Sequence, residues 1–511
     1  MSGADYVVVG GGTAGALLAT RLSEDPGTSV ILVEAGPSDE HEDRARTLRR
    51  WDEMVESEYD LDYRSVPQVR GNSEIRQTRS RILGGCSTTN TMIAWTPLAA
   101  DLQDWVARGA EGWGPDEILP YRERLLTPIQ PVADADRNQY VSDVVEAACA
   151  ALDLPLKPSG WDDGSLNADA RGAGFFDVGY TPESNLRSST SIHYLHPALA
   201  QRSNLSVITD VVVTRIVFDE ADGDPDSVPR AVGVRLADGR VLSAEREVLV
   251  CAGAIDSPAL LQRSGVGPVP VLRAAGVDVV ADLPGVGENL QDHAEGLVVW
   301  EATRSVPSTR ASGWDAGAML TLGDTPGAPD VLMHFPVEAW AVHPENHGYS
   351  FPEQIVSIAP NVAKPSSRGR VWITSPDPAV APCIDYRYFT DAEGHDESIL
   401  LAGVRAARRI AEAEPMASWV GRELFPGADV VTDAELSEVE RANHQTVYHV
   451  SCTCKMGSDD DPMAVLDPQL RVRGVSGLRV VDASSMPTLT ATNPVVTIMM
   501  VAERAADLIR D

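Results

Sequence analysis

Lysine is almost absent from this chain of 511 residues, and positive charge of any kind is scarce. Lys157, Lys364 and Lys455 are the only lysines, and 42 lysines and arginines stand against 75 aspartates and glutamates, a formal net charge of −33. Nucleic-acid binding needs a basic face that neutralises phosphates, and anionic membranes attract basic segments. The charge therefore argues against nucleic-acid and membrane partners, and the simplest role of the acidity is solubility.

Cysteine and long apolar runs are scarce as well. Six scattered cysteines do not indicate a disulfide framework, and Cys452 and Cys454 lack the second pair that a zinc knuckle requires, so we expect no metal site. No apolar run reaches about 18 residues, the length of a membrane span. The first residues have the pattern of a buried strand rather than a signal peptide. We expect a soluble, cytoplasmic protein with a large core.

A glycine-rich turn follows the first predicted strand. The β-branched run 5–9 leads into Gly10-Gly11-Gly12-Thr13-Ala14-Gly15, a helical stretch at 16–22, and a second strand at 29–33 that ends at Glu34. This is the dinucleotide fingerprint in its required context. Gly10 makes the tight turn, Gly12 lets a pyrophosphate approach the helix N-terminus, and Gly15 lets the helix pack on the strand. Glu34, at the end of the second strand, can accept hydrogen bonds from both ribose hydroxyls. A carboxylate there disfavours a 2′-phosphate, so FAD or NAD is expected rather than NADP.

The rest of the chain mixes strand and helix patterns. Strand patterns at 204–218, 231–236 and 240–250, around an acidic turn at 219–226, predict antiparallel strands inserted into an α/β core. A buried strand at 247–254 precedes Ser257-Pro258, which is expected to open a helix, and residues 158–174 have the composition of loops. Further predictions are a helix at 397–413, a strand at 478–483 and a helix from about 497 to 509. The nucleotide domain is therefore expected to be discontinuous.

Two groups of residues carry side chains suited to chemistry. His449 could accept a hydroxyl proton, and Asn493 could hold the resulting alkoxide. A carboxylate among aromatic rings suits a quaternary ammonium ion, and Glu295 with Trp51, Trp314 and Tyr448 has that chemistry. Sequence spacing alone does not show that the members of either group lie together in the fold. The alternatives are that His449 is an ordinary surface or structural histidine and that the aromatic residues belong to the core.

The chain resembles the glucose–methanol–choline (GMC) oxidoreductases, and within them is most similar to the choline oxidases. The matching motifs extend from residue 5 to residue 507, and so cover essentially the whole chain. They are GGGTAG at 10–15, RILGGCS at 81–87, AGAIDSP at 252–258, LPGVGENLQDH at 283–293, Tyr448-His449, and the segment from Asp482-Ala483-Ser484 to Asn493-Pro494.

The resemblance implies a mixed α/β (α+β) fold with a Rossmann-type FAD-binding domain and a substrate-binding domain built on a mostly antiparallel sheet. The implied FAD-binding domain is discontinuous, over residues 1–150, 187–294 and 447–511, and the substrate-binding domain covers 151–186 and 295–446. His449 and Asn493 occupy the positions of the catalytic pair, and Trp51, Glu295, Trp314 and Tyr448 those of the cation cage. The implied cofactor-binding residues are Gly10, Gly12, Thr13, Ala14, Gly15, Glu34, Gly84, Gly85, Thr89, Asn90, Thr91, Val213, Ala252, Asp482, Ala483, Asn493 and Pro494.

Several positions depart from the choline oxidase pattern. Thr89 stands where those enzymes carry a histidine joined covalently to the flavin, so we expect non-covalent FAD. Thr91 replaces a serine, Val450 a proline and Cys452 a glycine, which alters the loop beside His449. These changes leave room for a different substrate or for a dehydrogenase that avoids O₂.

The implied reaction is oxidation of a small primary alcohol, with hydride transfer to flavin N5. The first expectation is a choline-like cationic alcohol with O₂ as acceptor, giving H₂O₂. The alternatives are an oxidase or dehydrogenase of a neutral aryl or sugar-derived alcohol, and a flavin-dependent lyase or decarboxylase of the same fold. A non-catalytic flavoprotein would leave His449 and Asn493 without a role. Related enzymes are often dimers, so a homodimer is also an open expectation.

Overall fold

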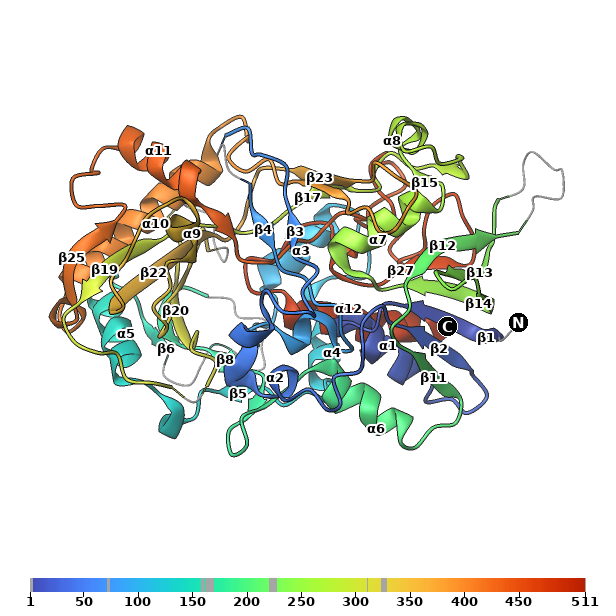
Figure 1. Cartoon of the computed structure of the whole chain (residues 1–511), viewed down its shortest axis with the longest axis horizontal. Coiled ribbons are helices and arrows are strands. Elements are labelled where there is room, and N and C mark those ends of the chain that lie inside the picture. Colours follow the sequence, from blue (N-terminus) through green and yellow to red (C-terminus); the bar gives the residue numbers. More distant parts are fainter. Residues whose placement is uncertain are drawn as a thin grey trace.

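The computed structural model describes residues 3–70, 74–157, 161, 170–219, 228–309, 311–322 and 329–510. Two sheets lie at opposite ends of the long axis, with the chain termini close together beside the first sheet (Figure 1). The loops expected at 158–174 and the acidic turn at 219–226 lie mostly outside the described residues. The domain boundaries given above stay a prediction.

The first sheet combines a parallel core with an antiparallel extension. Strands β1, β2, β11 and β27 run parallel to their neighbours, while β12, β13 and β14 pair antiparallel. The order is β11 (Leu205–Ile208), β2 (Val30–Val33), β1 (Gly3–Val9), β14 (Val241–Val250), β13 (Ala231–Leu236) and β12 (Val213–Phe218), and β27 (Leu478–Val480) pairs with β14. The expected antiparallel strands thus extend the same sheet rather than forming a separate layer. β2 is buried throughout, as expected for a strand covered on both faces.

Helices α1 (Thr13–Leu22), α7 (Gly253–Arg263) and α12 (Val495–Arg510) flank this sheet, and α1 packs directly on α12. The strand predicted at 247–254 ends at Val250, and α7 begins at Gly253 rather than at Ser257-Pro258. A proline inside a helix leaves one carbonyl without its N–H donor. Here the hydroxyl of Thr453 donates to the carbonyl of Ala254 at 2.6 Å, which compensates for Pro258.

The second sheet is mostly antiparallel, and helix α10 (His395–Glu412) packs on its strand β22. The order is β25 (Val420–Phe425), β19 (Val298–Ala302), β22 (Ile355–Val362), β21 (Val331–His334), β20 (Ala316–Leu320), β7 (Gly172–Phe175) and β6 (Leu156–Lys157). All eight residues of β22 are buried. Because successive side chains of a strand point to opposite faces of the sheet, one face of β20, β21 and β22 points toward the interior of the molecule.

A short junction connects the two halves and positions the site. β18 (Ala294–Glu295) pairs with β22 and with β26 (Gln445–Thr446), and Gln291 bridges to Ser451 on the other side. Two segments more than 150 residues apart in sequence therefore run antiparallel, side by side. This pairing places residues 292–295 next to residues 446–449.

Candidate functional site

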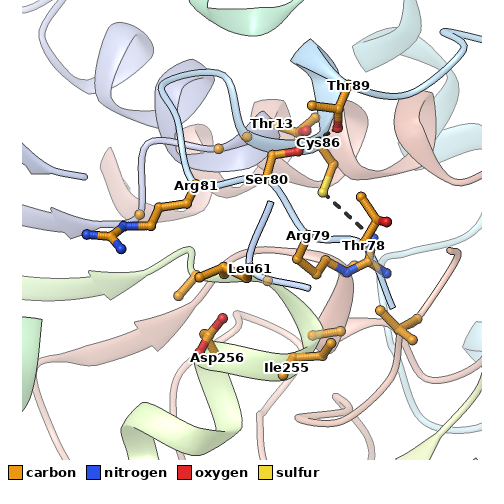
Figure 2. A pocket seen from close by; sticks show the side chains of 18 of the residues that line it. Thr13, Leu61, Thr78, Arg79, Ser80, Arg81, Cys86, Thr89, Ile255 and Asp256 are labelled. Atoms are coloured by element: carbon orange, nitrogen blue, oxygen red, sulfur yellow. Dashed lines mark hydrogen bonds between the residues drawn. The ribbon is translucent and has the colours of Figure 1, made fainter. Parts of the chain in front are cut away.

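One cavity of about 860 Å³ extends from the glycine turn after β1 to a group of indole rings beside the second sheet. Figure 2 shows part of its wall, where Arg79, Ser80, Cys86 and Thr89 come together opposite Asp256. Of the residues expected to bind cofactor or substrate, Gly15 and Gly84 lie outside the lining. The expected residues that line the cavity are Gly10, Gly12, Thr13, Ala14, Glu34, Trp51, Gly85, Thr89, Asn90, Thr91, Val213, Ala252, Glu295, Trp314, Tyr448, His449, Asp482, Ala483, Asn493 and Pro494.

The glycines of the turn have different spatial requirements. Gly10 has φ of +98°, and a Cβ there would lie 2.6 Å from the carbonyl oxygen of Cys251. A Cβ on Gly15 would lie 1.9 Å from the carbonyl oxygen of Gly10, so Gly15 lets α1 pack on the turn. A Cβ on Gly12 would touch Gly85 only at an ordinary 3.7 Å. The protein atoms around Gly12 thus leave space for a side chain larger than hydrogen, at the point where the cavity wall begins.

Glu34 lies at the end of β2 and is held by backbone groups. Its two carboxylate oxygens accept hydrogen bonds from the N–H of Gly11 at 2.7 Å and of Gly36 at 2.8 Å. Burial raises the pKa of Glu34 to about 7, against the effect of these N–H donors. Each oxygen keeps a second lone pair for a hydroxyl donor in the cavity.

Asp482 joins the C-terminal strand to the start of α7. One of its oxygens accepts from the N–H of Gly253 at 2.8 Å and from the hydroxyl of Ser257 at 2.6 Å. The other accepts from the N–H of Ser484 at 2.8 Å. The ends of β14 and β27 and the N-terminus of α7 thereby form one continuous part of the cavity wall.

The segment after β4 (Arg76–Gln77) crosses the middle of the cavity. Gly85 touches the glycine turn, since a Cβ there would lie 2.6 Å from Cα of Gly12. The hydroxyls of Thr89 and Ser80 are 2.5 Å apart, and Arg79 lies 3.7 Å from the sulfur of Cys86 (Figure 2). Arg79 also donates to the carbonyl of Tyr448 at 2.7 Å, which ties this segment to the loop that carries His449.

His449 belongs to a chain of hydrogen bonds that defines its protonation. His293 Nε2 lies 3.0 Å from the carbonyl of Thr490, which can only accept, so this nitrogen carries a hydrogen. Burial lowers the pKa of His293 to about 3, so the ring is neutral and its Nδ1 must accept. His449 Nδ1, 2.9 Å away, therefore donates to it. Burial, with His293, His334 and Arg79 nearby, holds the pKa of His449 well below its usual range, which leaves Nε2 unprotonated.

Asn493 lies beside Nε2, the unprotonated ring nitrogen of His449. Its amide nitrogen is 3.3 Å from Nε2, and its amide oxygen is buried without a hydrogen-bond partner. The main-chain N–H of His449 donates to Asp292 at 2.8 Å, which fixes the backbone of the loop. The structure thus brings together the two residues expected to form the reactive pair, and adds His293 and Asp292 as their supports.

Glu295 and the aromatic residues form the far end of the cavity. Trp51, on the 3₁₀ segment Leu48–Met54, donates from its indole nitrogen to the carbonyl of Ser312 at 2.9 Å. The rings of Trp51 and Trp314 are nearly perpendicular at 77°, with centroids 6.4 Å apart. A cation in such a corner lies within about 6 Å of both ring faces, the range for attraction. Burial raises the pKa of Glu295, and the neighbouring His334, Asn361 and Trp340 oppose this shift.

Three residues of the site were missed by sequence reasoning. His293 supports His449, while His334 and Trp340 line the cavity beside Glu295. Trp340 packs edge-on to Trp314 with centroids 5.1 Å apart, and His334 Nδ1 lies 3.7 Å from the Glu295 carboxylate. His293 stands next to Asp292 in a motif already noted. His334 and Trp340 carry no local signal, because the pairing of β21 with β20 and β22 brings His334 to this wall and the loop before α9 brings Trp340 there.

The loop beside His449 contains Val450 and Cys452, two of the residues that depart from the choline oxidase pattern, and both are buried. Cys452 has φ of +74°, a conformation that favours glycine, and its side chain is fully buried. Burial raises the pKa of Cys452 to about 12 and that of Cys454 well above its usual range, so neither thiol is poised to react. Val450 lines the cavity, whereas Cys452 does not.

Comparison with known proteins agrees with this geometry. Two family models described as GMC oxidoreductase match residues 4–295 and 365–502. The chain belongs to the GMC oxidoreductase family, and is an FAD-dependent enzyme that acts on the CH–OH group of alcohols. It is 42% identical to choline oxidase of Arthrobacter globiformis, over 99% of this chain and 94% of that protein. It is 35% identical to oxygen-dependent choline dehydrogenase of Vibrio vulnificus, with the same coverage.

Among solved structures, pyridoxine 4-oxidase from Mesorbium loti superposes with a TM-score of 0.88 at 31% identity, over 99% of this chain and 98% of that one. The mixed α/β fold expected from the sequence is therefore confirmed. Within the described residues, no helix is both long and apolar enough to cross a membrane. The same residues contain no cluster of three histidine, cysteine or acidic side chains suited to a metal.

Proposed function

We propose that this enzyme oxidises a small, choline-like cationic alcohol, with O₂ as electron acceptor and H₂O₂ as product. The observation that carries the proposal is the joint arrangement around one cavity: a neutral His449 with an unprotonated Nε2 at one wall, and Glu295 among indole rings at another. The first supplies a base for a hydroxyl group. The second supplies charge and ring faces for the cationic end of the same molecule.

Different residues of this chain accept the hydroxyl proton, stabilise the alkoxide and orient the cation. His449 Nε2 accepts the hydroxyl proton, and its Nδ1–H remains bonded to His293, so the ring does not rotate as it becomes charged. The amide N–H₂ of Asn493 is directed to the same point and stabilises the developing alkoxide. Glu295 and Trp51 orient the cation, which holds the alcohol carbon in one place relative to the base.

The nucleotide end of the cavity fits an extended FAD. Gly12 leaves open space at the N-terminus of α1, Glu34 presents two oriented oxygens, and the cavity continues without interruption to His449. When bound, FAD supplies the acceptor for the hydride that leaves the alcohol carbon. Thr13 and Ala14 would border its diphosphate, and Thr89 and Asn90 would border the ring system.

We further propose that the FAD is not covalently attached. Thr89 and Ser80 face the cavity with hydroxyl groups bonded to each other, and a hydroxyl is a poor nucleophile for such a link. Acid precipitation of the purified protein should release all of its yellow colour into the supernatant. A yellow pellet would contradict the proposal and would direct attention to Cys86, the cavity-lining thiol three residues before Thr89.

Anaerobic mixing with choline tests the proposed function. We expect the flavin absorbance band to bleach, and to return when air is admitted if O₂ is the acceptor. Bleaching that air does not reverse would indicate a dehydrogenase. If choline causes no bleaching, the cationic substrate is excluded, and if no alcohol does, a lyase or decarboxylase of this fold becomes the better description.

A charge-matched comparison separates a cationic from a neutral substrate. Glu295→Gln keeps the shape of the side chain but removes its charge, so KM for choline should rise roughly tenfold or more, because the ion attraction is lost in a buried site. KM for 3,3-dimethylbutan-1-ol, the neutral isostere of choline, should change little. Equal effects on both alcohols would contradict a cation subsite at Glu295.

The second candidate is an oxidase of an aromatic alcohol. Trp340 packs edge-on against Trp314 and adds a third indole ring to those of Trp51 and Trp314 in the lining, and such rings also suit contact with an aromatic substrate. A 31% identical structure is named for pyridoxine, an alcohol on an aromatic ring. Faster anaerobic bleaching by pyridoxine or benzyl alcohol than by choline would favour this candidate.

A further inference from the structure

The carboxylate of Glu295 lies between two imidazole rings, one beside each oxygen. Nδ1 of His334 is 3.7 Å from Oε2, and Nε2 of His343 is 3.6 Å from Oε1. His334 lines the cavity, whereas His343 lies outside the lining, on the short helix α9 (Val342–Asn346). All three side chains are at most 2% exposed, so their interactions take place without water screening.

The two imidazoles differ in what they offer to the carboxylate. The amide nitrogen of Asn361 lies 3.1 Å from Nδ1 of His334, and 3.0 and 3.1 Å from the carbonyl oxygens of Leu332 and Ala359, so Nδ1 of His334 already has a polar neighbour other than Glu295. His343 has neither ring nitrogen in a hydrogen bond. Of the two imidazoles, His343 is therefore the one whose nitrogen nearest to Glu295 has no other hydrogen-bond partner.

The protonation of His343 follows from its surroundings. Burial, with His444 and His347 nearby, holds the pKa of His343 well below its usual range, so the ring is neutral and has one N–H. With the hydrogen on Nδ1, the lone pairs of Nε2 and of Glu295 Oε1 would face each other at 3.6 Å. With the hydrogen on Nε2, a donor faces a carboxylate, so electrostatics selects the Nε2–H form. A movement of a few tenths of an ångström would complete the hydrogen bond, and such bonds often tighten only when substrate binds.

We propose that His343 is a positioning residue for the cation subsite: its Nε2–H donates to Glu295 from behind the cavity wall and keeps that carboxylate ionised and correctly oriented for the cationic end of the substrate. This inference rests on the proposed function. His343 touches neither the substrate space nor His449, so its effect belongs to cation binding rather than to proton abstraction. Burial favours the neutral form of a carboxyl group, and each N–H donor directed at Glu295 opposes that effect.

Three substitutions at one position test the proposal. His343→Leu removes both nitrogens and keeps the volume apolar. His343→Gln places an amide N–H close to the position of Nε2, and His343→Asn places one close to Nδ1, away from Glu295. We expect KM for choline to rise roughly tenfold or more in the Leu and Asn variants, the size of a lost hydrogen bond to a charged group, and to stay near the wild-type value in the Gln variant. The value of kcat should change much less than KM in all three.

Neutral and inert probes complete the design. KM for 3,3-dimethylbutan-1-ol should be the same in wild type and the three variants, and the affinity for tetramethylammonium, followed by perturbation of the flavin spectrum, should fall with KM for choline. Equal KM values for choline in wild type and the Leu and Asn variants would overturn the role of His343 and leave the proposed function intact. A parallel loss for the neutral alcohol, or failure of Gln to restore affinity, would show a merely structural role. If wild type is not reduced by choline at all, the proposed function fails, and the inference fails with it.

Discussion

At the scale of single residues, the reactivity of His449 depends on the hydrogen bonds that fix its tautomer and on the burial that lowers its pKa. A carbonyl oxygen of Thr490 orients His293, and His293 in turn orients His449, so the tautomer of the base is set two hydrogen bonds away. Burial then keeps both rings neutral. The arrangement differs from a histidine ring paired with a carboxylate, because Nδ1 of His449 donates to the neutral ring of His293, whereas Asp292 accepts from the main-chain N–H of His449.

His449→Ala should lower kcat by roughly tenfold or more with FAD retained, because the variant has no group to accept the hydroxyl proton. Steady-state oxidation of the best alcohol found, normalised to flavin content from its absorbance, measures this. His41→Ala, at an exposed position outside the cavity lining, is the control for histidine loss. Unchanged turnover in the His449 variant would refute its assignment as the base.

The pH dependence should differ between cationic and neutral alcohols. Burial raises the pKa of Glu295 above its ordinary value, so the carboxylate gains a proton as pH falls and cation binding weakens. His449, whose pKa is lowered, stays neutral below the usual titration range of histidine, so proton acceptance persists there. We therefore expect kcat/KM for choline to begin its acid decline at a higher pH than kcat/KM for 3,3-dimethylbutan-1-ol. Coincident acid limbs in the two profiles would argue against separate groups.

At the scale of elements, the turn between β1 and α1 contains glycines kept for two different reasons. Gly15 is needed by the protein, because a Cβ there would collide with the Gly10 carbonyl at 1.9 Å. Gly12 has an ordinary φ of −75° and no close protein neighbour. Its small size is therefore explained by what enters the cavity rather than by the fold.

Gly12→Ala and Gly15→Ala should therefore fail in different ways. The Gly12 variant should fold with a thermal transition close to that of wild-type apoprotein but bind FAD weakly, since the methyl group occupies the space for the diphosphate. The Gly15 variant should lose stability even without FAD, because α1 must move. Differential scanning of the apoproteins, together with FAD titration, separates the two effects. Similar apoprotein stability in both variants would contradict the packing role of Gly15.

At the scale of the whole molecule, the cavity lies between the two sheets and is lined by residues from both. Its walls come from β1 and α1 at one end and from β18, β21 and the loop before β20 at the other, and the strip 291–295 paired with 445–451 lies between them. A ligand that fills this space contacts segments from nearly the whole length of the chain. Its binding free energy therefore adds to the stability of the entire fold.

Removal of FAD should lower the unfolding temperature of the whole protein in a single transition. With FAD at about a hundred times its Kd, linkage predicts a loss of about 2.7 kcal/mol on removal. Calorimetry of apoprotein and of apoprotein with increasing FAD measures this, and the transition should rise steadily with FAD concentration. A transition confined to one half of the molecule would show that the cofactor stabilises the nucleotide-binding sheet alone.

The sequence by itself determined the features that depend on neighbouring residues. The strand, glycine turn, helix and terminal Glu34 were predictable because backbone geometry allows few residue types there, and α10 and α12 followed from their periodicity. The start of α7 was predicted four residues too late, because the partner that compensates for Pro258 is the distant Thr453.

Only the tertiary structure decided which side chains meet. His449 and Asn493 are 44 residues apart, and His293 and His449 are 156 residues apart, so neither contact follows from spacing, and the pairing of β18 with β26 brings His293 to His449. His334, Trp340 and His343 reach Glu295 through strand register and the short helix α9. A sequence records residue types along one dimension, whereas the tautomer of a base or the charge of a buried carboxylate depends on neighbours that long-range packing alone supplies.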